Sequence, residues 1–198
     1  VSRTVLREAL KTLAAKGMIE ARARIGTRVL PRGRWNLFDA DVLSWHFETG
    51  PDVAFLRSLS EIRIAVELES AALAASRRSP EQAAALIACA TAMGQTTTPE
   101  DFARTDLQFH RTVAEAAGNP FMASISALVE LALTAAFTIS SPIRDPAAMV
   151  ATVAAHGRIA QAISAGDAEE ARQAMKAVIT EGLERQLKAR AARNLREP

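Results

Sequence analysis

The sequence has a single cysteine, Cys89, and no long uninterrupted apolar run. One cysteine excludes an internal disulfide framework and a cysteine-rich metal cluster, so a reducing cytoplasm fits better than secretion. A membrane-spanning helix needs roughly 18 consecutive apolar residues. Even the stretch from Ile125 to Ile139 is broken by polar side chains, and no signal peptide is recognisable. These absences favour a cytoplasmic globular protein.

Charge is distributed unevenly along the 198 residues. Residues 1–34 carry nine Lys or Arg and two Glu, a net charge of +7, whereas the other residues carry 15 basic and 20 acidic side chains, a net of −5. A compact basic segment joined to a mildly acidic body is typical of a nucleic-acid contact attached to a separate domain. A merely solvated basic face is the alternative that charge alone leaves open.

The basic segment has the pattern of a short helix followed by two strands. Ser2 can cap a helix, and an apolar stripe that begins at Val5 ends at Gly17. Two strand-like runs, "MIEAR" and "TRVLP", flank a turn at Gly26. Arg3 and Arg7 lie one turn apart at the start of the helix, where they could contact base edges or phosphates in a major groove.

The segment "VSRTVLREALKTLAAKGMIEARARIGTRV" resembles the recognition helix and wing of the GntR family of bacterial transcription regulators. The resemblance implies binding to a palindromic operator and a winged helix whose two preceding helices are absent, so we expect an amino-terminally truncated chain. It also implies six DNA-contacting residues: Ser2, Arg3, Thr4, Arg7, and, at the wing tip, Gly26 and Thr27.

Helix-start signals divide the remaining chain. Ser79, Thr98, Asn119 and Asp145 each precede a proline, the arrangement that caps a helix and begins its first turn. The signals predict helices near 40–48, 52–77, 80–93, 99–117, 120–140, 146–165 and 167–193. The expected fold is all-α, an antiparallel bundle of six to seven helices preceded by the second half of a winged helix-turn-helix. The expected divisions are 1–31 for DNA binding, 32–50 for a linker, and 51–194 for the bundle.

The linker contains both tryptophans, Trp35 and Trp45, among other apolar side chains. So many large apolar residues favour a hydrophobic strap that packs against the bundle or a second subunit over a ligand site. We refer to residues 32–47 as the strap.

Two predicted helices carry polar residues on their apolar faces. Asp106 and His110 fall on the face of Phe102 and Val113, and His156 falls on the face of Val153 and Ile163. A buried carboxylate must be paired, hydrogen-bonded or bound to metal, and this group suits a first-row divalent ion. The alternative is that Asp106 and the histidines simply hydrogen-bond one another.

The runs "DLQFH", "GNP" and "AHGRIAQAISAGDAEEARQAM" resemble the FCD effector domain of the FadR-like branch of GntR regulators, over about residues 57–187. The resemblance implies metal ligands at Asp106, His110 and His156, for Zn, Ni or Mn. Val178 occupies the position of the usual third histidine, so the ligand set is incomplete. Either the effector completes the coordination, or no metal binds and the histidines contact the ligand.

Two arginines are candidates for binding an effector carboxylate. The resemblance places Arg63 toward the pocket, and Arg185 lies seven residues after Val178 on the same helix face. A guanidinium binds carboxylate through two hydrogen bonds. The alternatives are that Arg63 pairs with Glu67 and that Arg185 is solvated.

The strap "RWNLFDADVLSW" resembles the linker of FCD regulators of sugar-acid catabolism. This implies a homodimeric repressor that releases DNA when an aldonate such as galactonate contacts Arg63, Arg185, Thr152, and the Asp106, His110 and His156 group. A regulator of another carboxylate, such as a hexuronate or lactate, remains open. A metal-dependent hydrolase or oxygenase is a further alternative, disfavoured because no general base or nucleophile is evident.

Overall fold

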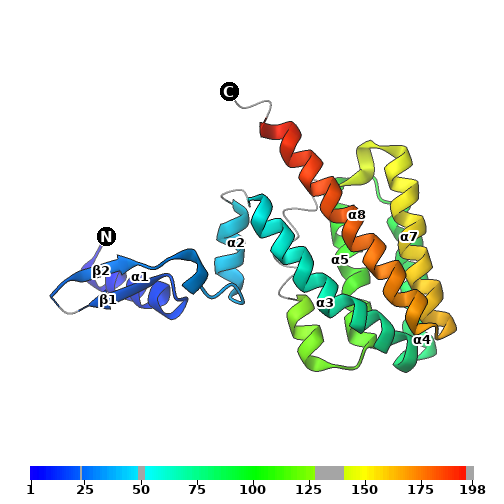
Figure 1. Ribbon diagram of the computed structural model, residues 1–198, viewed down its shortest axis with the longest axis horizontal. Coiled ribbons are helices and arrows are strands. Elements are labelled where there is room, and N and C mark those ends of the chain that lie inside the picture. Colours follow the sequence, from blue (N-terminus) through cyan, green and yellow to red (C-terminus); the bar gives the residue numbers. More distant parts are fainter. Residues whose placement is uncertain (23, 49–51, 128–140, 195–198) are drawn as a thin grey trace. The chain divides into compact units, whose positions relative to one another are not determined.

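The computed structural model describes residues 1–22, 24–48, 52–127 and 141–194. The chain forms two compact units, Val1–Thr49 and Gly50–Pro198, and each is described by itself. Among the described residues helices dominate, and the one sheet has two strands (Figure 1). The predicted class, all-α with a small wing, is confirmed.

The first unit begins with α1, Arg3–Ala15. The Ser2 side chain caps this helix by accepting a hydrogen bond from the Val5 amide at 3.2 Å. Gly17 follows with a φ of +71°, and a Cβ there would lie 2.5 Å from the Arg34 carbonyl oxygen. Only glycine fits this turn, because it tolerates positive φ and leaves room for the neighbouring backbone.

Strands β1, Ile19–Arg22, and β2, Gly26–Val29, form an antiparallel pair with Ile19 opposite Val29. The predicted order of helix, strand, turn and strand is therefore confirmed. No residue of α1 is buried, and Val5 is 60% exposed. The described residues thus leave the apolar stripe of this helix uncovered.

The strap folds against the end of α1 and the wing. It contains a short 3₁₀ helix, Arg32–Arg34, and α2, Ala40–Glu48. The Lys16 Nζ lies 2.6 and 2.8 Å from the two carboxylate oxygens of Asp39 and 2.8 Å from Asp41 Oδ2. Trp35 Nε1 donates to the Leu30 carbonyl at 2.9 Å. The strap is therefore tied to both neighbouring elements through polar contacts.

The second unit is a helical bundle. Its elements are α3 (Val53–Arg77), α4 (Pro80–Met93), α5 (Pro99–Ala116), a helical stretch at 120–127, a 3₁₀ helix (Pro142–Arg144), α7 (Pro146–Ala165) and α8 (Ala168–Asn194). The side chains of Ser79, Thr98 and Asp145 cap α4, α5 and α7 as predicted. Asn119 Oδ1 accepts from the Phe121 amide at 3.0 Å. The predicted helix over 120–140 is helical to residue 127, and its remainder lies outside the described residues.

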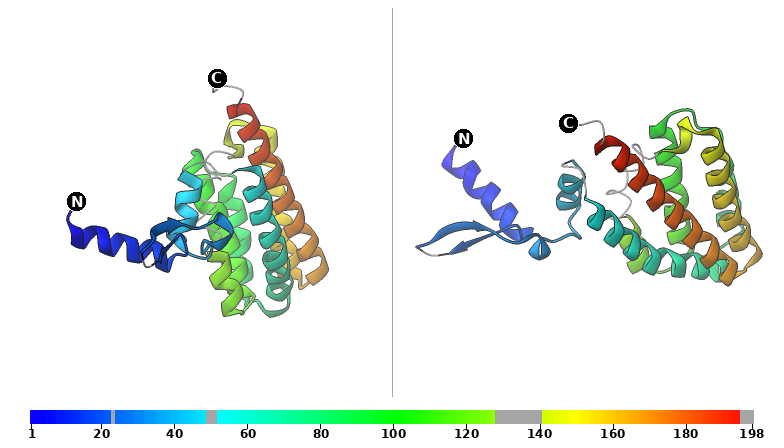
Figure 2. Two further views of the ribbon diagram at one scale, coloured as in Figure 1. Left: turned by 60° about the vertical axis from the view of Figure 1, so that its left-hand side comes forward. Right: turned by 45° about the horizontal axis from the view of Figure 1, so that its top comes forward.

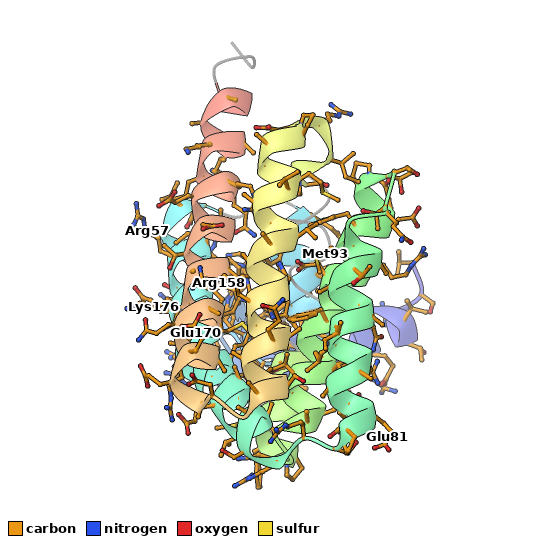
Figure 3. The ribbon with its side chains drawn as sticks, turned by 90° about the vertical axis from the view of Figure 1, so that its right-hand side faces the viewer. Arg57, Glu81, Met93, Arg158, Glu170 and Lys176 are labelled. Carbon is orange, nitrogen blue, oxygen red and sulfur yellow. The ribbon has the colours of Figure 1, made fainter. Side chains whose placement is uncertain are left out.

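Helices α3 and α8 lie side by side and run in opposite directions (Figures 1 and 2). Arg172 of α8 contacts Glu69 of α3 at 3.0 Å, which sets their register. Helices α7 and α8 are joined at Gly166, and Arg158 and Glu170 pair across their surface at 3.1 Å (Figure 3). The core between these helices includes Leu86, Met93, Phe109, Ile159, Ile163, Met175 and Ile179.

In the described part of the chain, no helix combines the length and apolarity needed to cross a membrane.

Candidate functional site

Helix α5 turns two polar side chains into the core. Asp106 and His110 are each only 5% exposed, and they lie one turn apart beside the fully buried Phe109. The Phe109 ring meets the rings of both His110 and His156 edge-on, with centroids 5.9 and 5.1 Å away. The predicted inward orientation of Asp106 and His110 is confirmed.

Helix α7 brings His156 to the same place, fully buried. Its Nδ1 lies 2.8 Å from the carbonyl oxygen of Thr152, and a carbonyl can only accept. A hydrogen therefore sits on Nδ1, and the other ring nitrogen, Nε2, is turned toward Asp106. That Nε2 faces Asp106 Oδ1 at 3.1 Å without the geometry of a hydrogen bond. Two electron-rich atoms facing each other need a proton or a cation between them.

His110, on α5, contacts two carboxylates. Its Nδ1 lies 2.7 Å from Glu67 Oε2, and its Nε2 lies 3.9 Å from Asp106 Oδ2. The ligating atoms that Asp106, His110 and His156 can offer all lie within 4.8 Å of one another. The two imidazole rings are nearly perpendicular, with centroids 5.6 Å apart.

This donor set fits a divalent metal ion. Imidazole and carboxylate ligands suit Zn, Ni and Mn. Among the described residues, His156 Nε2 and both ring nitrogen atoms of His110 are buried without a hydrogen-bond partner. Metal-bound histidines commonly donate their second nitrogen to a backbone carbonyl or a carboxylate. Here the Thr152 carbonyl accepts from His156 Nδ1, and the Glu67 carboxylate lies 2.7 Å from His110 Nδ1. Val178 is buried in the core and cannot ligate, so the described residues offer three ligands here.

Glu67 also belongs to this buried group, beside His110. The sequence alone indicated Glu67 only as a possible partner of Arg63. It is 7% exposed, and Arg63 Nε and Nη2 donate to its two oxygens at 2.7 and 3.3 Å. Burial raises the pKa of Glu67, but the charges of Arg63 and His110 outweigh burial and lower the pKa to about 2. The four-residue spacing of Arg63 and Glu67 on α3 was the available signal.

The other carboxylate and imidazole are also shifted by their neighbours. Burial raises the pKa of Asp106, but contacts with His156 and then the charges of His110 and Arg63 lower it overall. Burial lowers the pKa of His110, but the carboxylates of Glu67 and Asp106 raise it overall. The group is thus held together by opposite charges inside the bundle.

The remaining predicted effector residues flank this group. Thr152 is 2% exposed, and its Oγ1 has no hydrogen-bond partner among the described residues. Arg185 is partly buried with a fully buried Nε, and it interacts electrostatically with Asp106. The alternative of a freely solvated Arg185 is therefore wrong. Arg63 makes the contact with Glu67 that the sequence had offered as its alternative role.

The predicted DNA-contacting residues lie in the first unit. Arg3, Thr4 and Arg7 are exposed on the first turns of α1, and the Ser2 side chain also caps that helix. Gly26, with a φ of +99°, and Thr27 begin β2 at the end of the hairpin, both exposed. The turn that precedes Gly26 carries the exposed side chains of Arg24 and Ile25.

Comparison with known proteins identifies both parts. Residues 58–181 match the FCD domain, and residues 1–29 match the bacterial regulatory proteins of the gntR family. The chain belongs to the GntR family of transcription regulators, in its FCD branch. Because that family consists of transcription regulators, the metal-dependent enzyme alternative is set aside.

Two curated relatives from Escherichia coli strain K12 are similar over most of this FCD regulator. The uncharacterised HTH-type transcriptional regulator YieP is 33% identical over 90% of this chain and 77% of its own length. The galactonate operon transcriptional repressor is 30% identical over 93% of this chain and 80% of its own length. The solved structure of E. coli McbR/YncC shares the fold, with a TM-score of 0.62 at 16% identity, covering 95% of this chain and 81% of that chain.

Proposed function

We propose that this FCD regulator is a homodimeric repressor that releases a palindromic operator when a sugar acid binds inside the bundle. The observation that carries the proposal is the buried group of Asp106, His110 and His156, whose inward nitrogen atoms lack hydrogen-bond partners. Buried polar atoms without partners are rare in proteins unless they serve a ligand, an ion or water. A hydroxylated acid offers hydroxyl and carboxylate groups to such atoms.

A divalent ion is part of the proposal. Asp106, His110 and His156 would hold it, with Thr152 and Glu67 orienting the histidines from behind. Such an ion supplies Lewis-acid binding of hydroxyl or carboxylate oxygen. With Val178 in place of a fourth ligand, the protein leaves coordination for the effector to complete.

The similarity to the galactonate operon repressor makes an aldonate such as galactonate the first effector to test. Arg63, Arg185 and Thr152 are the proposed contacts beside the central group. A hexuronate, lactate or another organic acid is the second candidate, because the buried group itself requires only an oxygen-rich anion. The proposal places the protein in the cytoplasm with its operator.

DNA release depends on a difference in affinity between two conformations, since a ligand that binds both equally shifts nothing. The proposed contacts to DNA are Ser2, Arg3, Thr4 and Arg7 on α1, with Gly26 and Thr27 at the wing. A dimer would place two copies of α1 on the two halves of a palindrome.

The test measures operator release by fluorescence anisotropy, using the full-length protein encoded by its gene and a DNA fragment selected from random sequence. Galactonate, gluconate, galacturonate, glucuronate and lactate are titrated, with galactitol as the neutral control. We expect one acid to release DNA at concentrations at which galactitol does not. Unchanged DNA binding with every acid would contradict the proposed function.

A further inference from the structure

The bundle contains buried hydrogen-bonding groups beyond the Asp106, His110 and His156 group. Among the described residues, Ser60 Oγ, Thr152 Oγ1 and Arg185 Nε are buried without a hydrogen-bond partner. They come from α3, α7 and α8, three helices that pack on one another. An unpaired charged donor is the costliest of these, because a guanidinium out of water normally requires an anion.

Arg63 is poorly placed to be the free cation. It is 5% exposed, and its guanidinium already binds both oxygens of Glu67 at 2.7 and 3.3 Å. An incoming carboxylate would have to share this guanidinium with Glu67, which would weaken the pairing of that buried acid. Glu67 is also needed on its other side, because its Oε2 lies 2.7 Å from His110 Nδ1. Arg63 and Glu67 therefore form one unit that orients His110.

Arg185 differs from Arg63 on each of these points. Its Nε is buried without a partner, and the acids that act on it electrostatically are Asp106 and Glu181. Arg185 is near enough to Asp106 to feel its charge, although no hydrogen bond joins them. The guanidinium thus combines partial burial with an Nε–H that has no hydrogen-bond partner in the described part of the chain.

The register of α3 and α8 places Arg185 at the end of the bundle where Ser60 lies. The two helices are antiparallel, and Glu69 contacts Arg172 (Figures 1 and 2). Nine residues before Glu69 is Ser60, and nine residues after Arg172 is Glu181, one turn before Arg185. A rise of 1.5 Å per residue in both helices keeps these positions level.

We infer that Arg185 is the receptor for the effector's carboxylate, and that Arg63, held by Glu67, is a positioning residue for His110. The ligand class is a small hydroxycarboxylate, with its anionic end on Arg185 and its hydroxyl groups toward Ser60, Thr152 and the central group. This inference rests on the proposed function and divides its two arginines into different roles.

The experiment follows the Nε–H signals of the two arginines by NMR in the ¹⁵N-labelled protein. Arg185→Lys and Arg185→Gln assign one signal by its loss, and Arg63→Lys assigns the other. Glycolate, the smallest hydroxycarboxylate, is the probe. Ethylene glycol, which has a hydroxymethyl group in place of the carboxylate, is the matched neutral control, and sodium chloride controls for ionic strength.

We expect glycolate to move the Arg185 signal and to leave the Arg63 signal in place, with no response to either control. Movement of Arg63 alone, movement of neither signal, or an equal response to ethylene glycol would overturn the inference. If galactonate fails to release operator while glycolate still moves Arg185, the sugar-acid proposal fails and the assignment of Arg185 stands.

Affinity gives a second readout for any acid found to release DNA. A hydrogen bond to a charged group contributes about 1.5–3 kcal/mol, so Arg185→Gln should weaken binding of the acid about 10- to 100-fold. Arg185→Lys and Arg63→Lys form the matched pair, and Arg185→Lys should weaken binding more, because a lysine at residue 63 still places a cation beside Glu67. The opposite ranking would assign the carboxylate to Arg63 and overturn the inference.

Discussion

Nε2 of His156 lies 3.1 Å from Oδ1 of Asp106, although 50 residues of chain separate them. The Thr152 carbonyl accepts from the other ring nitrogen, Nδ1, so Nε2 is turned toward the carboxylate. This contact joins α5 to α7 inside the bundle and defines the centre of the candidate site.

Metal binding should depend on this contact. After chelator treatment, we expect the wild type to bind one divalent ion, with a rise in melting temperature on adding Zn, Ni or Mn. Asp106→Asn and His156→Gln should abolish the rise, because each removes one of the three ligands found among the described residues. His46→Gln changes the remaining histidine, which lies in the first unit, and is the matched control. Titration calorimetry with retained affinity in both site variants would contradict the assignment.

Introducing a histidine at residue 178 should strengthen the metal site. Val178→His would supply a fourth ligand, and we expect affinity to rise roughly tenfold or more, equivalent to about 1.4 kcal/mol. Val178→Leu controls for the altered packing at this buried position. Equal metal affinity in the two variants, measured by competition with a chromogenic chelator, would show that residue 178 is not directed at the ligand set.

Removing one member of the buried Arg63–Glu67 pair should lower the stability of the fold. Glu67→Gln removes the buried negative charge that faces Arg63 and His110 and should lower the free energy of unfolding by about 3–5 kcal/mol. The Arg63→Met/Glu67→Met double variant should be less destabilised than that single variant. Urea denaturation measures these values.

An exposed pair provides the comparison for that experiment. Asp101→Asn breaks the contact of Asp101 with Arg104, whose side chain is 79% exposed. This variant should lower the free energy of unfolding by less than about 1 kcal/mol. If Glu67→Gln lowers the free energy of unfolding no more than Asp101→Asn does, the buried Arg63–Glu67 pair is not important for stability.

The Lys16 contacts predict a pH dependence for the first unit. Hydrogen bonding to Asp39, with Asp41 second, raises the pKa of Lys16 above 10.5, and hydrogen bonding to Lys16 lowers the pKa of Asp39 below 3.8. The Asp39 contribution is therefore present above pH 3.8 and is lost as the pH falls through its lower folded pKa. The Lys16 contribution is present below pH 10.5 and is lost as the pH rises through its higher folded pKa.

We expect Lys16→Met to destabilise the first unit most between these two limits and to lose its effect outside them. Tryptophan fluorescence reports the transition, since Lys16 lies 5.7 Å from the centre of the Trp45 ring. Lys11→Met, which removes an exposed contact with Glu8, is the matched control. A constant difference between wild type and Lys16→Met at all pH values would refute the assigned contacts.

Local signals in the sequence predicted most of the fold. The helix starts at Pro80, Pro99 and Pro146 follow from a capping side chain and a proline that are adjacent in the chain, so no tertiary information is needed. The inward orientation of Asp106 and His156 was equally predictable, because helical periodicity places them among apolar residues. The two short 3₁₀ helices were not predicted, since they have no extended periodic pattern.

By itself, the sequence determined the helical periods, the caps, the basic segment and which polar residues face inward, because each depends on residues within a few turns of one another. Only the tertiary structure decided which of those residues meet. The rotation and register of α3, α5, α7 and α8 bring Glu67 to His110 and Asp106 to His156, and they leave Arg185 Nε unpaired while Arg63 is bound. Such contacts join residues far apart in the chain, and their pairing is set by how whole helices pack.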